Sequence, residues 1–375
     1  MPAEWEPHEA TILTWPHSRP GEHGVHPHWP GLFDQVPAIW ARMVKELEVG
    51  EDVHVLINDD ETEKNAKSEM KKANVQGNRV HLHRIPNNFS WARDHGPIVV
   101  VKQPSPGAAA PPSPAAPRLG SGQAPGEGRL FLDWGYNAWG GQWEYELDDQ
   151  VPTLIARKLG QQSLTVPMIL EGGSIDVNGL GTLLTTEDCL LNPNRNPGMT
   201  KEQIEQSLKD HLGVTNVLWL GKGIMGDDTS GHVDDLARFV GPRTVVTIIN
   251  ENSADPDYAP LQENLRRLQS MKDQDGHALE IITTAQPKPV LVHGKKPSSM
   301  SGVPDEGFRI PASYANFYVA NECVLLPVWN DPNDAAAIET LQKCFPHRRI
   351  VPIDSRVLTW GWGSFHCVTQ QIPAS

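Results

Sequence analysis

Cys367, near the C-terminus, is the first residue whose setting points to chemistry. It lies in the stretch GWGSFHCVTQQIPAS, beside His366 and after a turn that contains Gly361 and Gly363. Such a turn could bring a thiol to the surface on a tight backbone. A free thiol has a pKa of about 8.5, so a nucleophilic cysteine needs a nearby cation or dipole that favours the thiolate. The alternative is a buried structural cysteine, and that interpretation suits Cys189 in the apolar run DCLLN.

A second stretch, GDDTSGHVDDLARFV at residues 226–240, combines a histidine with several carboxylates. His232 is surrounded, with no intervening lysine, by Asp227, Asp228, Asp234 and Asp235. In an extended strand, His232 and Asp234 would face the same side, because side chains two residues apart share a face. That arrangement would place a proton carrier beside a carboxylate. A solvated acidic loop is the alternative.

Two further carboxylates lie where strands are expected to begin or end. Asp94, in NNFSWARDHGPIVVV, is expected at the start of a strand close to Trp91, with Gly96 and Pro97 fixing the turn. Glu171, in ILEGGSIDVNG, ends an apolar strand at a Gly-Gly turn, where a carboxylate could be partly buried and paired. The alternatives are an ordinary aspartate at a strand start and a glutamate that caps a turn.

The 15 histidines raise the question of a metal site. His81 and His83 share one face of RVHLHR, and a Pro/Gly-rich loop contains His17, His23, His26 and His28. The chain has no HExxH motif and no carboxylate-rich signature of a metal hydrolase. We therefore interpret His81 and His83 as a solvent-facing strand edge and expect no metal. The chain also lacks the GxGxxG and GxxxxGK[ST] motifs, so a nucleotide-driven reaction has no sequence support.

The elements that must position these residues follow a recurring pattern of an amphipathic helix, a short turn and a β-rich run. In the first copy, apolar residues between Val36 and Leu47 share one helical face, Gly50 follows, and VHVLI begins at Val53. Five more copies have their helices at 61–73, 150–159, 201–212, 260–272 and 334–344. This spacing predicts an α/β domain made of several small modules.

Residues 103–128 interrupt this pattern. They are nearly all Pro, Ala, Gly and Ser, so they cannot bury enough apolar surface to offset the entropy of ordering. The flanking runs GPIVVVK and RLFLDW are both strand-like. We expect a disordered surface insert between two strands.

Charge and composition narrow the class of partner. Over 375 residues, 32 Lys and Arg against 46 Asp and Glu give a net charge of −14. Such a surface would repel nucleic acid and anionic lipid and suits a small cationic substrate. The apolar runs are far shorter than a bilayer span, and the N-terminus lacks the order of a signal peptide. Four cysteines without metal or disulfide spacing fit reduced thiols, so we expect a cytoplasmic protein.

Taken together, these stretches resemble the agmatine deiminase and bacterial-type peptidylarginine deiminase family, within the guanidine-modifying superfamily. The matching pieces run in order from WEPHEATILTWP through WARDHGP, WGYNAWGG, EGGSIDVNGLGTLLTTEDCLLNPNRNP, GDDTSGHVDDLARFV and RIPASYANFYVAN to HCVTQQIPA. The resemblance implies one deiminase catalytic domain over 1–375, folded as a five-bladed pseudo-symmetric α/β propeller of ββαβ-type modules. Six helix–strand units are one too many for five blades, so the first module is expected to carry an extra helix.

The resemblance also implies roles for six residues. Cys367 corresponds to the nucleophile, His232 to the general acid/base, and Glu171 to the carboxylate that orients the histidine. Asp94 and Asp234 correspond to the two carboxylates that grip the guanidinium, and Trp91 corresponds to a wall of the substrate pocket. Two departures stand out: the turn before the cysteine reads GWGSF where many agmatine deiminases have an all-glycine turn followed by Asn, and residues 103–128 have no counterpart.

The implied activity is hydrolysis of agmatine to N-carbamoylputrescine and ammonia, a step of polyamine (putrescine) biosynthesis, through a covalent amidino-cysteine intermediate. No cofactor enters this scheme, and the family implies a homodimer. Deimination of free or peptide-terminal arginine is the first alternative. A metal-dependent ureohydrolase that releases urea from agmatine is the second, and a non-catalytic guanidinium-binding protein is the third.

Overall fold

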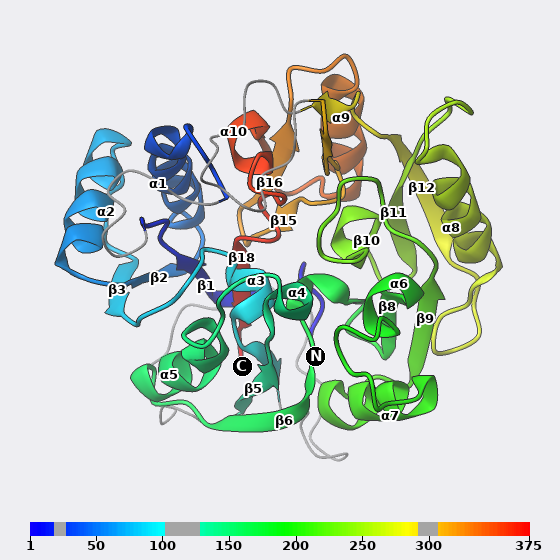
Figure 1. Ribbon diagram of the computed structural model, residues 1–375, viewed down its shortest axis with the longest axis horizontal. Coiled ribbons are helices and arrows are strands. Elements are labelled where there is room, and N and C mark those ends of the chain that lie inside the picture. The colour runs from blue at the N-terminus through cyan, green and yellow to red at the C-terminus, as the bar shows by residue number, and fades with distance from the viewer. Residues whose placement is uncertain (19–27, 102–127, 292–306) are drawn as a thin grey trace.

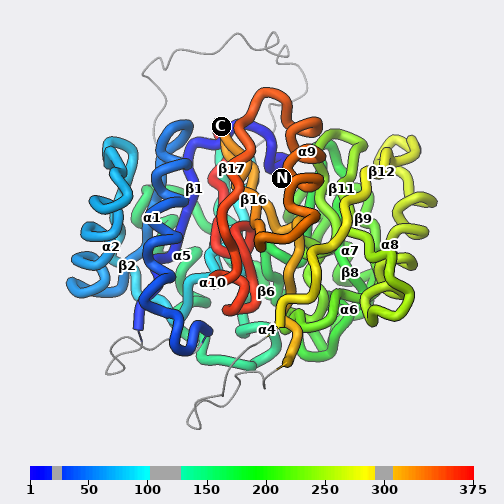
Figure 2. The backbone as a smooth tube through the Cα atoms, turned by 90° about the horizontal axis from the view of Figure 1, so that it is seen from above, coloured from blue at the N-terminus to red at the C-terminus, as the bar shows by residue number. Residues whose placement is uncertain are grey.

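The strands of the described residues form six small sheets. A computed structural model describes residues 1–18, 28–101, 128–291 and 307–375. Five of the sheets have three or four strands. They succeed one another in chain order around the centre of Figure 1, from the blue segment on the left through green to orange at the top. Most of the longer helices lie on the outside of this ring (Figures 1 and 2). The predicted α/β class is therefore confirmed, with several small mixed sheets.

The first sheet has the strand order β18-β1-β2-β3 and joins the two ends of the chain. β1 is antiparallel to β18 and parallel to β2, which is parallel to β3. Its elements are β1 (His8–Thr14), η1 (Phe33–Gln35), α1 (Val36–Leu47), β2 (Asp52–Ile57), α2 (Asp60–Lys72), β3 (Val80–Arg84) and β18 (Thr369–Pro373). This sheet alone contains two helix–strand crossovers, so the extra helix is in the first module, as predicted.

The other four larger sheets share one plan: the first strand is antiparallel to the second, and a helix leads to a third, parallel strand. The second sheet and its flanks contain α3 (Ala92–His95), β4 (Ile98–Val101), β5 (Arg129–Gly135), α4 (Ala138–Gly141), η2 (Asp148–Gln150), α5 (Val151–Lys158) and β6 (Ser163–Ile169). The third contains η3 (Gly172–Ser174), β7 (Asp176–Val177), β8 (Thr182–Thr186), α6 (Glu187–Leu190), α7 (Lys201–Leu212) and β9 (Asn216–Leu220).

The remaining elements follow in the same order. The fourth sheet contains η4 (Val233–Asp235), β10 (Ala237–Phe239), β11 (Thr244–Ile249), α8 (Tyr258–Ser270) and β12 (Glu280–Ala285). A two-stranded sheet of β13 (Val290–Leu291) and β14 (Arg309–Ile310) comes next. The last comprises β15 (Tyr318–Val319), β16 (Cys323–Val328), α9 (Asp334–Cys344) and β17 (Arg349–Asp354), followed by α10 (Arg356–Thr359).

The helices form where the apolar spacing and capping residues predict them. In α1 the predicted face, which includes Trp40, Met43 and Val44, is buried in the core. In α7 the Thr200 side chain accepts from the Gln203 backbone and the Gln203 side chain accepts from that of Thr200, while Gly213 ends the helix with φ 71°. Among the described helices, the largest shift of a boundary is two residues, in α8, which spans Tyr258–Ser270 rather than residues 260–272.

The insert lies between two strands that pair directly. Val101 of β4 is opposite Arg129 of β5, so the chain leaves and re-enters the sheet at neighbouring positions. This confirms that the segment connects adjacent strands. The predicted disorder of residues 103–128 falls, apart from Gly128, outside the described residues.

Candidate active site

Five short turns, each just before an end strand of a sheet, carry the residues of the site, and four of the turns contain predicted site residues. The turns precede β4, β7, β10, β15 and β18; in Figure 1, β15 and β18 are labelled near the centre and β10 to their right. α3 contacts η3, and η3 contacts η4, so turns far apart in sequence meet. In chain order these turns contain Asp94, Glu171, His232 with Asp234, Asn316, and Cys367.

Cys367 lies inside this cluster rather than at the surface. Its side chain is buried, with 4 % of the residue exposed, which contradicts the expectation of a surface thiol. Asn316 Nδ2 donates a hydrogen bond to Cys367 Sγ at 3.0 Å, and Asp234 Oδ2 lies 3.7 Å from the same sulfur. Burial, followed by the charges of Asp234 and Asp235, raises the pKa of Cys367 well above its usual range. The free protein therefore holds a thiol at neutral pH.

Gly173 marks the point where three predicted residues converge. A β-carbon on Gly173 would lie 2.5 Å from His232 Nδ1, 2.9 Å from Asp94 Oδ1 and 3.0 Å from Asp234 Oδ2. Only glycine leaves these three side chains their present positions. With Cys367 beside Asp234, the structure brings a thiol, an imidazole and two carboxylates together around one spot.

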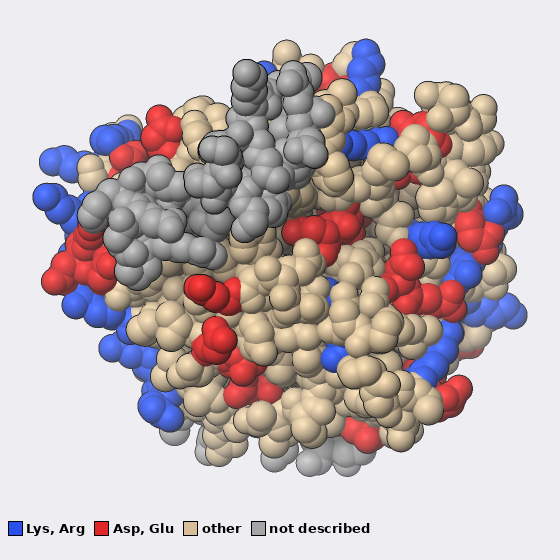
Figure 3. All heavy atoms as spheres, in the orientation of Figure 1, with Lys and Arg blue, Asp and Glu red and all other residues tan. Residues whose placement is uncertain are grey.

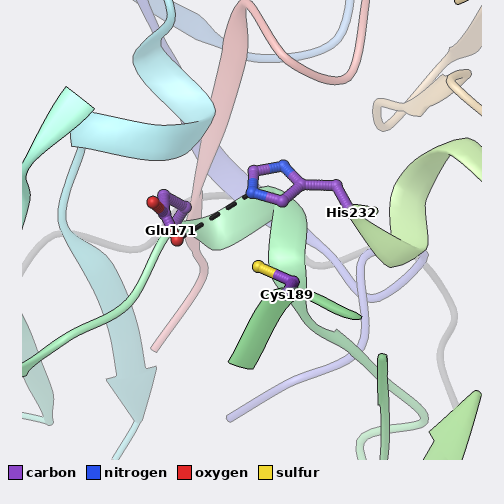
Figure 4. A group of neighbouring side chains, drawn as sticks. All are labelled: Glu171, Cys189 and His232. Carbon is purple, nitrogen blue, oxygen red and sulfur yellow. Dashed lines mark ion pairs between the residues drawn. The ribbon is translucent and has the colours of Figure 1, made fainter. Parts of the chain in front are cut away.

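His232 is fully buried between carboxylates. Its Nδ1 lies 3.8 Å from Asp94 Oδ1, and its Nε2 lies 3.9 Å from Glu171 Oε2 (Figure 4). Burial alone would lower the pKa of His232, but the charge of Asp94 and the proximity of Cys189 and Glu171 raise it well above its usual value. The predicted proximity of His232 and Asp234 is correct, but its stated reason is wrong: Asp234 belongs to the 3-10 turn η4, not to an extended strand.

Glu171 is held by a buried arginine. Arg195 Nε donates to Glu171 Oε1 at 2.6 Å, and both side chains are inaccessible to solvent. Burial would raise the pKa of Glu171, but the charges and hydrogen bonds of Arg195 and His232 lower it. Glu171 therefore stays ionised and presents Oε2 to His232. Its contacts are thus more than those of a residue that only caps a turn.

Asp94 is held by donors on both oxygens. Trp139 Nε1 donates to Oδ2 and the Gly173 backbone N–H donates to Oδ1, each at 3.1 Å. Burial is the main cause that raises the pKa of Asp94 to about 7. The charge of His232 opposes this rise, and the charges of Asp234 and Glu171 add to it. Asp94 lies in the short helix α3, a turn before the predicted strand.

Asp234 differs from Asp94 in its electrostatics. Its Oδ2 lies 2.7 Å from His366 Nδ1, whereas its buried Oδ1 has no hydrogen-bond partner among the described residues. Burial would raise the pKa of Asp234, but the hydrogen bond and charge of His366 lower it. The pKa of one predicted gripping carboxylate is therefore lowered, whereas that of the other is raised to about 7.

Trp91 packs beside the sulfur. A β-carbon on Gly363 would lie 2.5 Å from the Trp91 ring and 3.1 Å from Cys367 Sγ, so the indole and the thiol share a border. Trp91 Nε1 donates to His28 Nδ1 at 2.8 Å, and the His28 ring stacks on Phe89 at 4.3 Å. These contacts fix the indole as one side of the site.

The histidines that raised the question of metal binding have other surroundings. His83 is buried and lies 2.8 Å from His54 across the sheet, whereas His81 is exposed and pairs with Asp52. The interpretation of both as a solvent-facing edge is therefore wrong for His83. His17 is buried against asparagines; His23 and His26 lie outside the described residues.

Two groups in the described ranges have metal-ligating atoms close together. In one, Glu171, Cys189 and His232 have donor atoms within 4.8 Å of one another (Figure 4); the other, Asp273, Asp275 and His277, is largely exposed. Cys189 is buried, as expected for a structural cysteine, but it also lies against His232. Glu171 is already neutralised by Arg195, so the first group is explained as part of the acid/base site.

Three residues that hold the site were not singled out from the sequence: Asn316, Trp139 and Arg195. Each lies inside a long motif that carried the family resemblance, but pattern alone gives none of them a role. For Trp139, the Gly-rich segment AWGG is a signal visible in the sequence. In the structure this segment forms a left-handed turn in which Trp139 has φ 54°. Backbone strain of this kind is typical of functional sites.

The face seen in Figure 3 carries acidic side chains near its centre, while most lysines and arginines lie toward its edges. Such a distribution attracts a cation toward the middle of this face. None of the helices in the described ranges combines the length and the apolar character that crossing a membrane requires.

Comparison with known proteins identifies relatives of full length. The family model described as Porphyromonas-type peptidyl-arginine deiminase matches residues 1–373. A protein of Latilactobacillus sakei subsp. sakei (strain 23K), which carries the provisional name agmatine deiminase, is 35% identical over 100% of this chain and 96% of its own length.

Solved structures agree with this match. The agmatine deiminase of Enterococcus faecalis superposes with a TM-score of 0.85 at 32% identity, covering 100% of this chain and 95% of its own. A variant of the C. jejuni agmatine deiminase with substrate bound gives a TM-score of 0.78 at 28% identity, covering 99% and 95%. The fold is therefore that of these enzymes.

Proposed function

Because the chain belongs to the Porphyromonas-type peptidyl-arginine deiminase family, which hydrolyses guanidino groups, we propose that it is an agmatine deiminase. The observation that carries the proposal is the convergence at Gly173 of Asp94, Asp234 and His232, with the sulfur of Cys367 next to Asp234. We interpret the five larger sheets as the blades of a pseudo-symmetric α/β propeller that forms one catalytic domain, with this site at its centre.

Asp94 and Asp234 grip the substrate. A guanidinium is flat and carries N–H donors on several edges, so two carboxylates can each accept charge-assisted hydrogen bonds from it. They hold the central carbon, a poor electrophile because its charge is spread over three nitrogens, at attack distance from Cys367. Trp91 provides a flat wall for the cation.

Cys367 is the nucleophile and His232 moves the protons. The bound cation offsets the acidic surroundings of Cys367, so the thiol releases its proton to solvent when substrate binds, and the thiolate attacks the central carbon. His232, protonated in its ring of carboxylates, gives a proton to the leaving nitrogen, and ammonia departs from the tetrahedral adduct. The amidino group then remains bonded to Cys367 Sγ.

The neutral His232 takes a proton from water, and the resulting hydroxide attacks the amidino carbon. The C–S bond breaks with its electron pair on Cys367 Sγ, the hydroxyl of the adduct gives its proton to the leaving sulfur, and the ureido product is released with the thiol restored. Glu171 keeps the imidazole in place through both steps, and Arg195 keeps Glu171 charged. Side chains carry every step, and no cofactor is needed.

Agmatine suits this site better than arginine does. The far end of agmatine is an ammonium, which the acidic centre of this face attracts, whereas arginine adds a carboxylate that needs a cation of its own. The arginines bordering the site already pair with carboxylates: Arg93 with Glu4, Arg195 with Glu171, and Arg238 with Glu4 and Asp176. The family description favours peptide-terminal or free arginine as the second candidate.

Mass spectrometry after brief incubation with agmatine tests the proposal. We expect N-carbamoylputrescine, an equal amount of ammonia, and an amidino adduct on Cys367 in trapped enzyme. Cys367→Ser should lose the adduct and turnover. Cys344→Ser, which removes a partly exposed thiol from the end of α9, should retain both and serves as the matched control.

Each competing function gives a different result. Urea in place of ammonia, or loss of activity to a chelator, would indicate a metal-dependent ureohydrolase. Turnover of free or peptide-terminal arginine with none of agmatine would shift the substrate to arginine. A protein inert toward all three compounds that still binds agmatine would be a guanidinium-binding protein.

A further inference from the structure

His366 places each of its ring nitrogens against a carboxylate. Nδ1 lies 2.7 Å from Asp234 Oδ2, and Nε2 lies 2.9 Å from Glu4 Oε2, in a ring that is almost fully buried. An ionised carboxylate can only accept a hydrogen bond, and a neutral imidazole donates from one nitrogen only. Two such contacts are satisfied together only if both nitrogens carry protons. The geometry therefore describes an imidazolium between two carboxylates.

We infer that His366 is a positioning residue whose positive charge, held between Glu4 and Asp234, keeps Asp234 ionised and correctly turned for the guanidinium. The inference rests on the proposed function, in which Asp234 grips the substrate. It adds a second histidine to the site, adjacent in sequence to the nucleophile but without a role in proton transfer to substrate.

Asp234 shows what this contact does. His366 occupies Oδ2 and holds that atom 3.7 Å from Cys367 Sγ. The other oxygen, Oδ1, is buried and accepts no hydrogen bond from the described residues, so it remains available for a substrate N–H. Without His366, the carboxylate could rotate and lose this orientation.

Glu4 anchors the far end of the contact. Arg93 Nη2 lies 3.1 Å from Oε2, while Oε1 accepts from Arg238 Nη2 at 2.9 Å and from the Val319 backbone at 2.8 Å. Burial would raise the pKa of Glu4, but Arg238, His366 and Arg93 hold it well below its usual range. Glu4 is thus a fixed negative charge that faces Nε2 of His366.

The surroundings of Asp234 explain why such a charge is needed. The charged or titratable groups that influence it, apart from His366, are Asp94, Asp227, His232, Asp235, Arg238 and Cys367. Among the described residues, no imidazolium lies within hydrogen-bond distance of Asp94 or Asp235, and burial with neighbouring charges raises the pKa of each. Asp234 would behave in the same way if His366 were neutral.

The backbone of His366 is fixed independently of its ring. Its N–H donates to Asn316 Oδ1 at 3.1 Å, and its carbonyl accepts from Arg93 Nε at 3.3 Å. A substitution of the ring can therefore leave the loop in place. His366→Gln keeps a hydrogen-bonding side chain of similar reach but removes the charge.

Histidine NMR of the full chain tests the charge without using turnover. In ¹⁵N-labelled wild type, we expect the signals that disappear in His366→Gln to show both ring nitrogens protonated at pH 7. A neutral ring at that pH would overturn the inference. This readout is independent of the proposed function, which fails separately if the wild-type chain acts on no guanidine.

Kinetics test the consequence for Asp234. In His366→Gln, we expect KM for agmatine to rise by about tenfold or more at pH 7, with a smaller change in kcat, because a charge-assisted contact that orients the gripping carboxylate is lost. The acid limb of kcat/KM should also move to higher pH, because Asp234 then needs a higher pH to ionise. An unchanged KM and pH profile would refute the role.

Two carboxylate variants separate this role from simple loosening of the buried Arg238. Glu4→Gln and Asp176→Asn each remove a carboxylate from Arg238, but only Glu4 also contacts His366. We expect Glu4→Gln to lower the fraction of His366 that has both ring nitrogens protonated and to raise KM, and Asp176→Asn to leave both unchanged. Equal effects of the two variants would overturn the inference, and this pair decides it even if His366→Gln does not fold.

Discussion

Asn316 donates a hydrogen bond from Nδ2 to the sulfur of Cys367 at 3.0 Å, although the two residues are 51 positions apart. The same nitrogen donates to Asp235 Oδ1 at 3.0 Å, and Asn316 Oδ1 accepts the His366 backbone N–H at 3.1 Å. A donor aimed at sulfur stabilises a thiolate more than a thiol, so this contact favours the reactive form of Cys367.

Replacing Asn316 with Ala should slow the attack of Cys367. Loss of a hydrogen bond to a developing charge typically costs on the order of tenfold to a hundredfold in kcat/KM. Ammonia release with agmatine measures this, and the pH dependence of alkylation of Cys367 should show a further rise in the thiol pKa. Asn252→Ala, in an exposed turn, is the control. Unaltered alkylation together with unaltered turnover would contradict the role.

The ionisation of Asp94 should determine the acid limb of the pH dependence of turnover. Its pKa of about 7 means that it becomes an effective anion only as the pH rises through neutrality. The pKa of His232 is raised well above its usual value, so the proton that His232 donates is lost only on the alkaline side. We expect a bell-shaped profile of kcat/KM for agmatine, with its acid limb near pH 7. A flat profile, or an acid limb near pH 4, would show that Asp94 does not control binding.

Gly173→Ala should damage the site more than the fold. The added methyl would enter the space between His232, Asp94 and Asp234, and each side chain would have to move away. Displacements of about 1 Å in a reacting geometry can cost on the order of a hundredfold, so we expect kcat/KM to fall by about that factor with little change in Tm. Gly198→Ala provides the matched control, since a β-carbon there meets nothing within 4 Å. Similar losses in both variants would argue against a special role for Gly173.

The secondary structure follows closely from the sequence because it is locally encoded. The apolar face of α1 and the capping box of α7 each lie within one helix, and the pattern of apolar spacing finds both. The strands that follow the helices are apolar runs bounded by Gly and polar turns. That one module carries an extra helix could be predicted because six helix–strand units exceed the five blades that the family resemblance implies.

The site required more than local pattern. Its motifs single out Cys367 and His232, but Arg195 reaches Glu171 and Asn316 reaches Cys367 only through pairing of distant turns. Local reasoning also misjudged two conformations. Asp234 lies in a 3-10 turn because the chain bends before β10, and His83 is buried because it contacts His54 of the adjacent strand.

Asp148, a buried carboxyl outside the reacting centre, should make stability depend on pH. Its Oδ1 accepts from the Asn88 and Phe89 backbones, while Oδ2 has no partner among the described residues, and burial raises its pKa to about 8. Because its pKa is higher in the folded than in the unfolded protein, folding favours the protonated form. Its contribution to stability is complete below its usual pKa near 4 and is lost as the pH rises to about 8, by at most about 1.4 kcal/mol per pH unit.

Asp148→Asn keeps an acceptor at Oδ1 and cannot ionise, so its Tm should exceed that of wild type at pH 9 and approach it at pH 5. Asp149→Asn at the neighbouring, exposed position is the control, and a Tm difference for Asp148→Asn that does not grow with pH would show that Asp148 is not protonated in the folded protein.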